Sequence, residues 1–278
     1  MAWDDTARLE HSRRYVRYPI DLTVREWALV APLLPPAKLG GRPRTTCLRE
    51  ELNAILYIAS SGCQWRMLPA DFPPASTVRG YCYEWRDSAL LSTINGLLVI
   101  GARELEERQA SPTAGVINSQ SVKPLKAAGD RGYDAGKQVK RRKRHIVTDT
   151  LGLLLTGVIH AADIQDRDGA TIVLKSLRYR FPWLRHIFAD SGYAGEKLRR
   201  SLRGHGNWTL EIIKRSDTAK GFEVLPRRWV VERTFAWLGR CRRLAKDWER
   251  SIESETAWPL VASIRMLTRS IARYCICS

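Results

Sequence analysis

Two acidic residues stand at positions where metal-dependent chemistry would need them. Asp190 closes the apolar run LRHIFAD and precedes a Gly-rich turn, residues 191–195. An acid at the carboxyl end of a strand points into the crevice where α/β sheets bind ligands. Glu232 lies in the first turns of an amphipathic segment, and Arg228 precedes it by four residues on the same helical face. Taken singly, Asp190 also fits a turn cap and Glu232 a helix-dipole acid.

Together these two acids suit a hard divalent cation. Mg²⁺ and Mn²⁺ prefer carboxylate oxygens combined with phosphate oxygens and water. Two such ions about 3.5–4 Å apart activate a nucleophilic oxygen and stabilise the leaving oxygen in phosphodiester displacement. The chemistry that Asp190 and Glu232 indicate is therefore the cleavage or transfer of a phosphodiester.

The charge of the chain also indicates a polyanionic partner. Among 278 residues there are 46 Lys and Arg against 29 Asp and Glu, which gives a net charge of +17 and a pI near 10.0. A globular protein this basic usually binds nucleic acid, and a merely basic protein is the alternative. The candidate phosphate-binding residues are Lys137, Lys140, Arg141, Arg142, Lys143 and Arg144 in one cluster, and Arg240, Arg242, Arg243 and Lys246 in a second. A solvated charged face would explain the same clusters.

Helical signals dominate the N-terminal part. Thr23 and Glu26 have the spacing of a capping box. Apolar residues then recur at helical spacing over 48–59, and Gly62 predicts the end of that helix. A third helix is predicted after Ser76, with Arg79 and Arg86 off its apolar face and available to DNA. Two helices joined by a turn suit a helix-turn-helix reader of DNA, although three short helices also serve plain packing.

The periodicity changes after a polar stretch at 109–113, which predicts a helical domain over 1–110 and a second domain over 111–278. We predict strands over 115–122, 145–149, 153–160, 184–190 and 210–214, and helices over 171–180, 196–202, 226–249 and 256–272. Asn118 falls in the first of these strands. This order predicts an α/β fold with a ribonuclease H-like mixed sheet flanked by helices, preceded by the small helix-turn-helix-like domain.

Composition argues against several other classes of protein. There is no run of eighteen apolar residues, and the N-terminus has no apolar h-region, so we expect neither secretion nor a membrane span. The six cysteines lack the spacing of a zinc site. We expect reduced cysteines that serve packing in a cytosolic protein.

Several long blocks resemble the insertion-sequence 5 family of bacterial transposases, which belong to the DDE class. The blocks are ILYIASSGCQWRMLPADFPPASTV, RGYDAGKQVKRRKRHIVTDTLGLLLTGVIHAADIQDRDGA, FADSGYAG and RRWVVERTFAWLGRCRRLAKDWE. They occur in the family's order and cover nearly the whole chain. The resemblance implies that Asp190 and Glu232 are catalytic acids and metal ligands. It implies that Arg228 orients Glu232 or a phosphate, and that two Mg²⁺ or Mn²⁺ ions are the cofactors.

One position departs from the family in a way that concerns the chemistry. The first catalytic Asp of the family falls on Asn118, which offers one neutral carbonyl oxygen instead of a bridging carboxylate. Asp149, which ends a nearby strand, is a weak alternative source of the third carboxylate. The wider superfamily's Tyr is Leu225 here, and its downstream basic position is Gly239, with Arg240 next to it.

The resemblance implies recognition of the terminal inverted repeats of an insertion sequence, followed by metal-dependent strand cleavage and strand transfer. The partners would be double-stranded DNA and a second copy of the chain on that DNA. Neither a membrane nor a small-molecule substrate is expected, and the location would be the bacterial cytoplasm, at the nucleoid. Two alternatives stay open: a catalytically impaired DNA-binding protein, which Asn118 favours, and an ordinary metal-dependent nuclease on the same fold.

Overall fold

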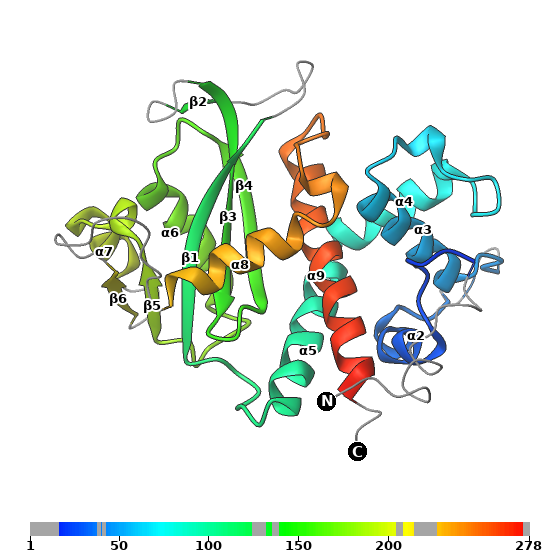
Figure 1. Ribbon diagram of the computed structural model, residues 1–278, viewed down its shortest axis with the longest axis horizontal. Helices are drawn as coiled ribbons and strands as arrows, with labels where there is room; N and C mark the ends of the chain where they lie inside the picture. The colour runs from blue at the N-terminus through cyan, green and yellow to red at the C-terminus, as the bar shows by residue number, and fades with distance from the viewer. Residues whose placement is uncertain are drawn as a thin grey trace, which may run out of the picture.

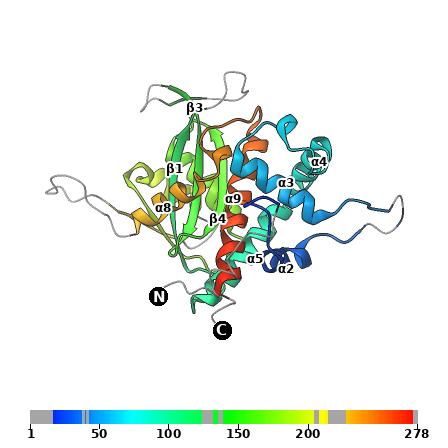
Figure 2. The ribbon, with the colours of Figure 1, turned by 45° about the vertical axis from the view of Figure 1, so that its right-hand side comes forward.

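A six-stranded sheet and a group of helices lie on opposite sides of one long C-terminal helix (Figures 1 and 2). The computed structural model describes residues 17–37, 40, 43–123, 132–134, 139–203, 208–213 and 227–274. The strands are β1 (Ala114–Val122), β2 (Gly132–Asp134), β3 (Val139–Asp149), β4 (Leu154–Ala161), β5 (His186–Ala189) and β6 (Thr209–Ile212). The α-helices are α2 (Val24–Val30), α3 (Leu48–Ser61), α4 (Ala75–Asp87), α5 (Leu90–Leu105), α6 (Asp166–Leu177), α7 (Glu196–Leu202), α8 (Arg228–Leu238) and α9 (Ile252–Tyr274). Short 3₁₀ turns occur at η1 (Ala31–Leu33), η2 (Trp65–Met67), η3 (Ser191–Tyr193) and η4 (Arg242–Leu244).

The sheet is mixed, as the order of elements predicted. Its strands run in the order β2-β3-β1-β5-β6, and β4 pairs with β3. β1 is antiparallel to β3 and parallel to β5, and β5 is parallel to β6. Helix α8 crosses the front of β1 in Figure 1, and α6 and α7 lie towards the β5–β6 side. The predicted α/β fold, a ribonuclease H-like mixed sheet with helices around it after an N-terminal helical region, is confirmed.

The N-terminal helices begin and end largely where local chemistry predicted. The Thr23 side chain accepts the Glu26 N–H while the Glu26 carboxylate accepts the Thr23 N–H, so the capping box forms. Gly62 ends α3 in the left-handed conformation, with φ of 70°. The start of α4 was predicted wrongly: Pro74, not Ser76, is the N-cap residue, because its carbonyl already accepts the N–H groups of Thr77 and Val78.

Among the boundaries that differ from the prediction, three matter for the site. β3 starts at Val139 instead of His145, so the first basic cluster is part of a strand. Helix α6 starts at Asp166 instead of Thr171. Helix α8 ends at Leu238 with Gly239 as its C-cap, so the second basic cluster does not continue the helix of Glu232. Glycine costs a helix interior about 1 kcal/mol relative to alanine, which favours an end at Gly239.

Helix α9 packs the sheet and the N-terminal helices together. It contacts α2, α3, α5 and β4, and its predicted apolar positions Trp258, Val261 and Ile264 are buried. No described helix is long and apolar enough to cross a membrane. The four described cysteines carry free thiols, and one of them, Cys47, is exposed instead of packed. Cys275 and Cys277 lie outside the described residues.

Candidate active site

Asn118 lies on β1, and Asp190 directly follows β5, the neighbouring parallel strand. The register of the two strands pairs Ala114 with His186 and Val116 with Phe188. Two residues further along each strand, the same register brings Asn118 level with Asp190, just past the end of β5. The strand that carries the family's first acid and the strand that carries its second are therefore adjacent in this sheet.

Asp190 has a local structural role in addition to any chemical one. Its Oδ1 accepts the Gly192 N–H at 2.8 Å, which caps the short turn η3. This is the turn-cap role that the sequence left open, and it holds the carboxylate at the carboxyl end of β5. The side chain is half-buried, so it stays accessible from the crevice.

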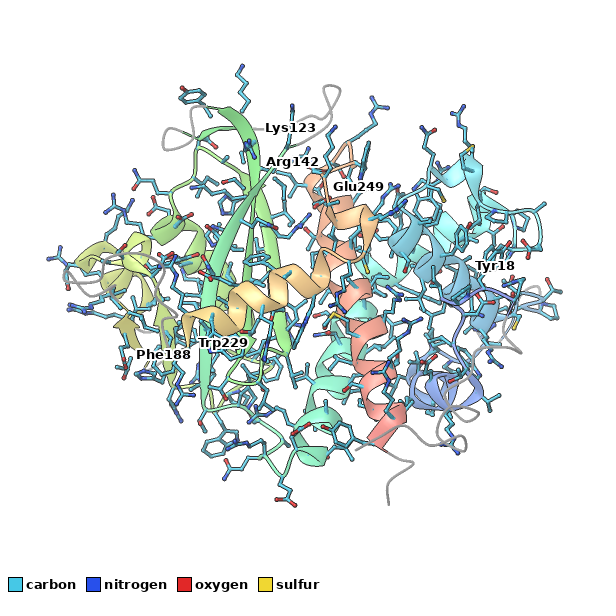
Figure 3. All side chains as sticks on the ribbon, in the orientation of Figure 1. Tyr18, Lys123, Arg142, Phe188, Trp229 and Glu249 are labelled. Carbon is cyan, nitrogen blue, oxygen red and sulfur yellow. The ribbon has the colours of Figure 1, made fainter. Side chains whose placement is uncertain are left out.

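Glu232 lies on α8, which covers the sheet face to which Asn118 belongs. On β3, Arg144 pairs with Gln120 and its side chain reaches Glu255 of α9. Since strand side chains alternate between faces, Gln120 and Asn118 share the face covered by α8 and α9. The Arg227 guanidinium, next to the start of α8, lies over the Phe188 ring of β5, and Figure 3 labels Phe188 and Trp229 in this part of the molecule.

The predicted pairing of Arg228 with Glu232 is present. Arg228 Nε donates to Glu232 Oε1 at 3.1 Å, and 37% and 51% of the two side chains are exposed. An exposed pair of this kind contributes little to stability, about 0.3–0.5 kcal/mol for helical i,i+4 spacing. Its exposure leaves both groups available to a phosphate or a cation.

The side chain of Asn118 offers the site little negative charge. Its Oδ1 accepts the N–H of Ser119 at 2.7 Å. The remaining side-chain group is an NH₂, which donates hydrogen bonds and does not bind cations. Asn118 is therefore a poor replacement for a bridging carboxylate.

Asp149 cannot take over that role. It pairs in register with Gly115, at the opposite end of β1 from the crevice, and it is fully buried. Its carboxylate binds Arg103 and accepts the N–H groups of Leu151 and Leu153. These contacts make it a structural acid that closes the β3–β4 turn.

The first basic cluster is largely interior, which corrects the expectation that its arginines contact phosphates. Arg142 is fully buried and donates to Asp247 at 2.8 Å, and Arg144 is buried against Glu255. Lys143 donates to the Ile164 carbonyl at 3.0 Å and pairs with Asp166 at 3.1 Å. Side chains alternate between the two faces of β3, and both faces are covered here: Arg142 and Arg144 point to one face and Lys143 to the other. None of the three side chains is therefore exposed to DNA.

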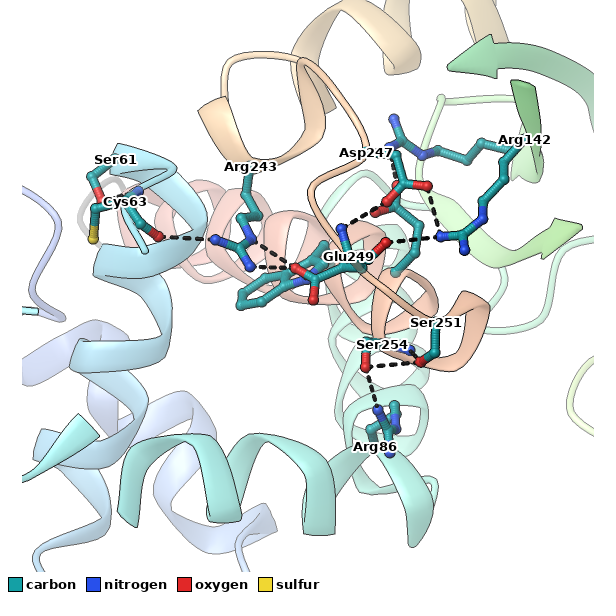
Figure 4. Close-up of polar contacts among 12 residues, drawn as sticks. Ser61, Cys63, Arg86, Arg142, Arg243, Asp247, Glu249, Ser251 and Ser254 are labelled. Carbon is teal, nitrogen blue, oxygen red and sulfur yellow. Dashed lines mark hydrogen bonds and ion pairs between the residues drawn. The ribbon is translucent and has the colours of Figure 1, made fainter. Parts of the chain in front are cut away.

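The basic residues of the second cluster and of α4 also divide into buried and accessible ones. Arg243 is buried between Glu249 and the Cys63 carbonyl, as Figure 4 shows, and its guanidinium lies over the Trp258 ring. Arg86 is half-buried and bonds Asp87 and Ser254. Besides Arg86, the candidates with exposed or half-buried side chains are Arg79, Lys140, Arg141, Arg240, Arg242 and Lys246. Lys137 lies outside the described residues.

Polar residues that the sequence did not single out also surround the crevice. Ser119 donates its hydroxyl to Asp166 Oδ1 at 2.9 Å. His145 is fully buried, and its Nδ1 lies 3.2 Å from the Tyr193 hydroxyl. Burial, reinforced by the neighbouring His160, lowers the pKa of His145 well below its ordinary value, so the ring is neutral. Asp166 belongs to the acidic segment DIQDRDG, which comes soon after β4. An acid that follows a strand is the sequence signal that could have identified Asp166.

The donor set of the crevice fits a magnesium-like cation. Asp190 and Glu232 provide carboxylate oxygens, and both are accessible. Mg²⁺ is usually held by one or two protein carboxylates, with water and substrate phosphates completing its shell. Within the described ranges, no three His, Cys, Asp or Glu side chains are grouped closely enough to hold a metal by themselves.

Comparison with known proteins agrees with this geometry. The family described as "Transposase DDE domain" matches residues 109–267, and "Putative transposase of IS4/5 family" matches residues 22–95. Over 123 residues the chain is 35% identical to "Putative transposase for insertion sequence element IS402" of Burkholderia cepacia. The matched region covers 42% of this chain and 57% of that protein. Over 114 residues it is 28% identical to "Insertion element IS402 uncharacterized 16.2 kDa protein" of the same organism, covering 38% and 75%.

No solved structure matches the chain. The "Transposase DDE domain" match spans more than half of the sequence and contains Asn118, Asp190 and Glu232 together. It also contains the whole of the sheet. The chain belongs to the DDE transposase family of insertion sequences.

Proposed function

We propose that this protein binds the terminal inverted repeats of its insertion sequence and catalyses strand cleavage and strand transfer. The observation that supports this most directly is the alignment of Asn118 with Asp190 on adjacent strands, beneath the helix that carries Glu232. A phosphodiester-transfer site on this fold would draw its residues from these three elements. Asp190 and Glu232 would hold the divalent cations, which would supply charge neutralisation and activation of the attacking oxygen.

The protein's own residues position the DNA for this reaction. Arg228 orients the Glu232 carboxylate through their ion pair on α8. The Arg228 guanidinium also binds the scissile phosphate. Lys140, Arg240 and Arg242 contact the DNA backbone, because their side chains are exposed. The conformation of η3, capped by Asp190, holds that carboxylate at the strand end before DNA arrives.

A second candidate function rests on Asn118. A site with one carboxylate fewer holds the second cation weakly, so the protein would grip repeat ends without cutting them and act as a repressor or competitor. Loss of even an outer-shell partner commonly costs about 10–100-fold in metal affinity or activity, and loss of a direct ligand should cost more.

The two functions separate in a cleavage assay on duplex DNA that carries the terminal repeats of the element. We expect slow or absent cleavage by the natural sequence in Mg²⁺, and an increase of at least about tenfold for Asn118→Asp. The matched control is Gln120→Glu, which adds a carboxylate to the same strand face two residues away. Natural protein that cleaves as fast as Asn118→Asp would show that position 118 does not limit the reaction.

DNA binding is measured on the same duplex and on a random duplex. Preference for the repeat ends supports either function as a protein of the element, whereas equal affinity for both duplexes argues against end recognition. Absence of cleavage by Asn118→Asp despite such binding would favour the DNA-binding function. An Asp190→Ala change in the Asn118→Asp background should remove cleavage and leave the preference for repeat ends intact.

A further inference from the structure

Asp166, the first residue of α6, belongs to the same crevice as Asp190. Its Oδ1 accepts the Ser119 hydroxyl at 2.9 Å and lies 3.1 Å from Lys143 Nζ. Ser119 immediately follows Asn118 on β1 and points to the opposite face of the sheet, so Asp166 approaches this part of β1 from the α6 side. The side chain of Asp166 is 30% exposed, which leaves it open to solvent ions.

Gly192 shows how closely the two carboxylates approach. A Cβ placed on Gly192 would lie 3.0 Å from Asp190 Oδ1 and 3.3 Å from Asp166 Oδ2. Both carboxylates therefore reach the same point above the turn η3. Two carboxylates that share a site repel one another unless a cation or a proton lies between them. Oδ1 of Asp166 bonds Ser119 and Lys143, so Oδ2 is the oxygen turned towards Asp190.

His145 provides an independent sign that something polar belongs here. Its ring is fully buried, and its Nε2 has no hydrogen-bond partner among the described residues. That nitrogen lies 3.6 Å from Asp166 Oδ1, too far for a direct hydrogen bond. Buried polar atoms are almost always partnered in native proteins. A hydrated cation at Asp166 would bring water within reach of Nε2, whichever tautomer the ring adopts.

We propose that Asp166 supplies to the metal site at Asp190 the carboxylate that Asn118 lacks. Asp166 approaches Asp190 from the α6 side of the sheet, whereas Glu232 approaches from the α8 side. The cation would then be held by Asp166 and Asp190, within the one or two protein carboxylates that Mg²⁺ usually takes. This inference rests on the proposed function, because it assumes that Asp190 holds a metal.

The test measures Mn²⁺ binding to the purified full chain by titration calorimetry, without DNA. Asp166→Asn should weaken Mn²⁺ binding by about tenfold or more. The amide oxygen of this variant can still accept the Ser119 hydroxyl, which preserves the local hydrogen bond. Asp168→Asn is the matched control, because Asp168 lies in the same helical turn and pairs with Lys197 instead. That control should bind Mn²⁺ as the natural protein does.

Asp190→Asn separates the two levels of the argument. If Asp190→Asn weakens Mn²⁺ binding and Asp166→Asn does not, the inference about Asp166 is overturned and the proposed metal site stands. If neither change weakens binding, the metal site itself is overturned. The metal site is also overturned if the natural protein binds no Mn²⁺ even at millimolar concentration.

Rescue distinguishes a ligand from a residue that merely supports the fold. In the Asp166→Asn background, Asn118→Asp should restore Mn²⁺ affinity at least in part, because it returns a carboxylate to the crevice from β1. Mn²⁺ should also broaden the imidazole NMR signals of His145, assigned with His145→Gln, in the natural protein and not in Asp166→Asn. Full broadening in Asp166→Asn would place the ion elsewhere and overturn the proposal. Equal thermal unfolding midpoints in EDTA show that the variants are folded.

Discussion

Two regions of this protein use the same kinds of charged side chain for different purposes. Arg142 and Arg144 of β3 form ion pairs that are almost wholly buried, with Asp247, which precedes α9, and with Glu255 of α9. At the crevice, Arg228 and Glu232 form a pair that is largely open to solvent. The interior pairs hold two parts of the chain together, while the crevice keeps its charges accessible. Burial, and not residue type, separates structural charge from functional charge here.

The largest expected effect comes from breaking an interior pair. Arg144→Ala should lower the free energy of unfolding by about 3–5 kcal/mol, because it leaves the buried Glu255 without its arginine partner. Urea denaturation followed by circular dichroism measures the change. Arg240→Ala, which removes an exposed arginine, is the control and should stay within about 0.5 kcal/mol of the natural protein. Equal effects for the two variants would contradict the division between the regions.

Glu51 extends the comparison of buried and exposed charges, because it is a buried acid that forms no hydrogen bond with a described residue. Both of its carboxylate oxygens lack a hydrogen bond among the described residues, and burial, with a contribution from Glu50, raises its pKa from 4.5 to about 7. The folded state then binds this proton more tightly than the unfolded state does. The stability that it contributes is complete below about pH 4.5 and declines as the pH rises to about 7.

Glu51→Gln should remove that decline. Each pKa unit corresponds to about 1.4 kcal/mol, so the variant should gain stability relative to the natural protein at pH 8 and not at pH 4.5. Urea denaturation at the two pH values measures the difference, with the exposed Glu84→Gln as control. A difference between Glu51→Gln and the natural protein that does not change with pH would show that the pKa of Glu51 is the same in the folded and unfolded states.

Asp190 should behave in the opposite way to the interior acids. Asp190→Asn keeps an oxygen that can accept the Gly192 N–H, so the η3 turn is preserved. We expect a stability change within about 0.5 kcal/mol, as for surface substitutions. In the Asn118→Asp background the same change should abolish metal-dependent cleavage. A destabilisation of several kcal/mol would mean that Asp190 is structural.

The smallest effect concerns a single exposed lysine. Lys140→Ala should reduce by about one the slope of log affinity for duplex DNA against log salt, since one phosphate contact is lost. Lys143→Ala should leave that slope unchanged, because Lys143 is engaged by Ile164 and Asp166. Fluorescence anisotropy between about 50 and 200 mM salt gives both slopes. Equal slopes for the two variants would remove the distinction between exposed and interior members of the first basic cluster.

Local signals in the sequence predicted several features that the structure confirms. The capping box at Thr23 and Glu26 and the left-handed end of α3 at Gly62 form as expected. The spacing of Arg228 and Glu232 gives a real contact. These features depend on interactions within a few residues of the chain, which the sequence displays directly.

Features that depend on distant elements were not predictable in this way. The run at 139–144 resembles a surface cluster of positive charge until β3 pairs with β1 and α9 covers one of its faces. The end of α8 at Gly239 redirects Arg243 inward to Glu249. Neither Asp247 nor Glu249 shows by its local sequence that it is the partner of a buried arginine.

For the candidate site, the types of residue and their order along the chain could be read from the sequence. It gave Asp190 after an apolar strand, Glu232 in an amphipathic helix, and an asparagine where the family has its first acid. The tertiary structure alone decided which of these residues meet. The parallel pairing of β1 with β5 aligns Asn118 with Asp190, and the start of α6 brings Asp166 to the same turn. The physical reason is that strand register and helix packing minimise exposed apolar surface over the whole molecule, so contacts between distant residues are set globally.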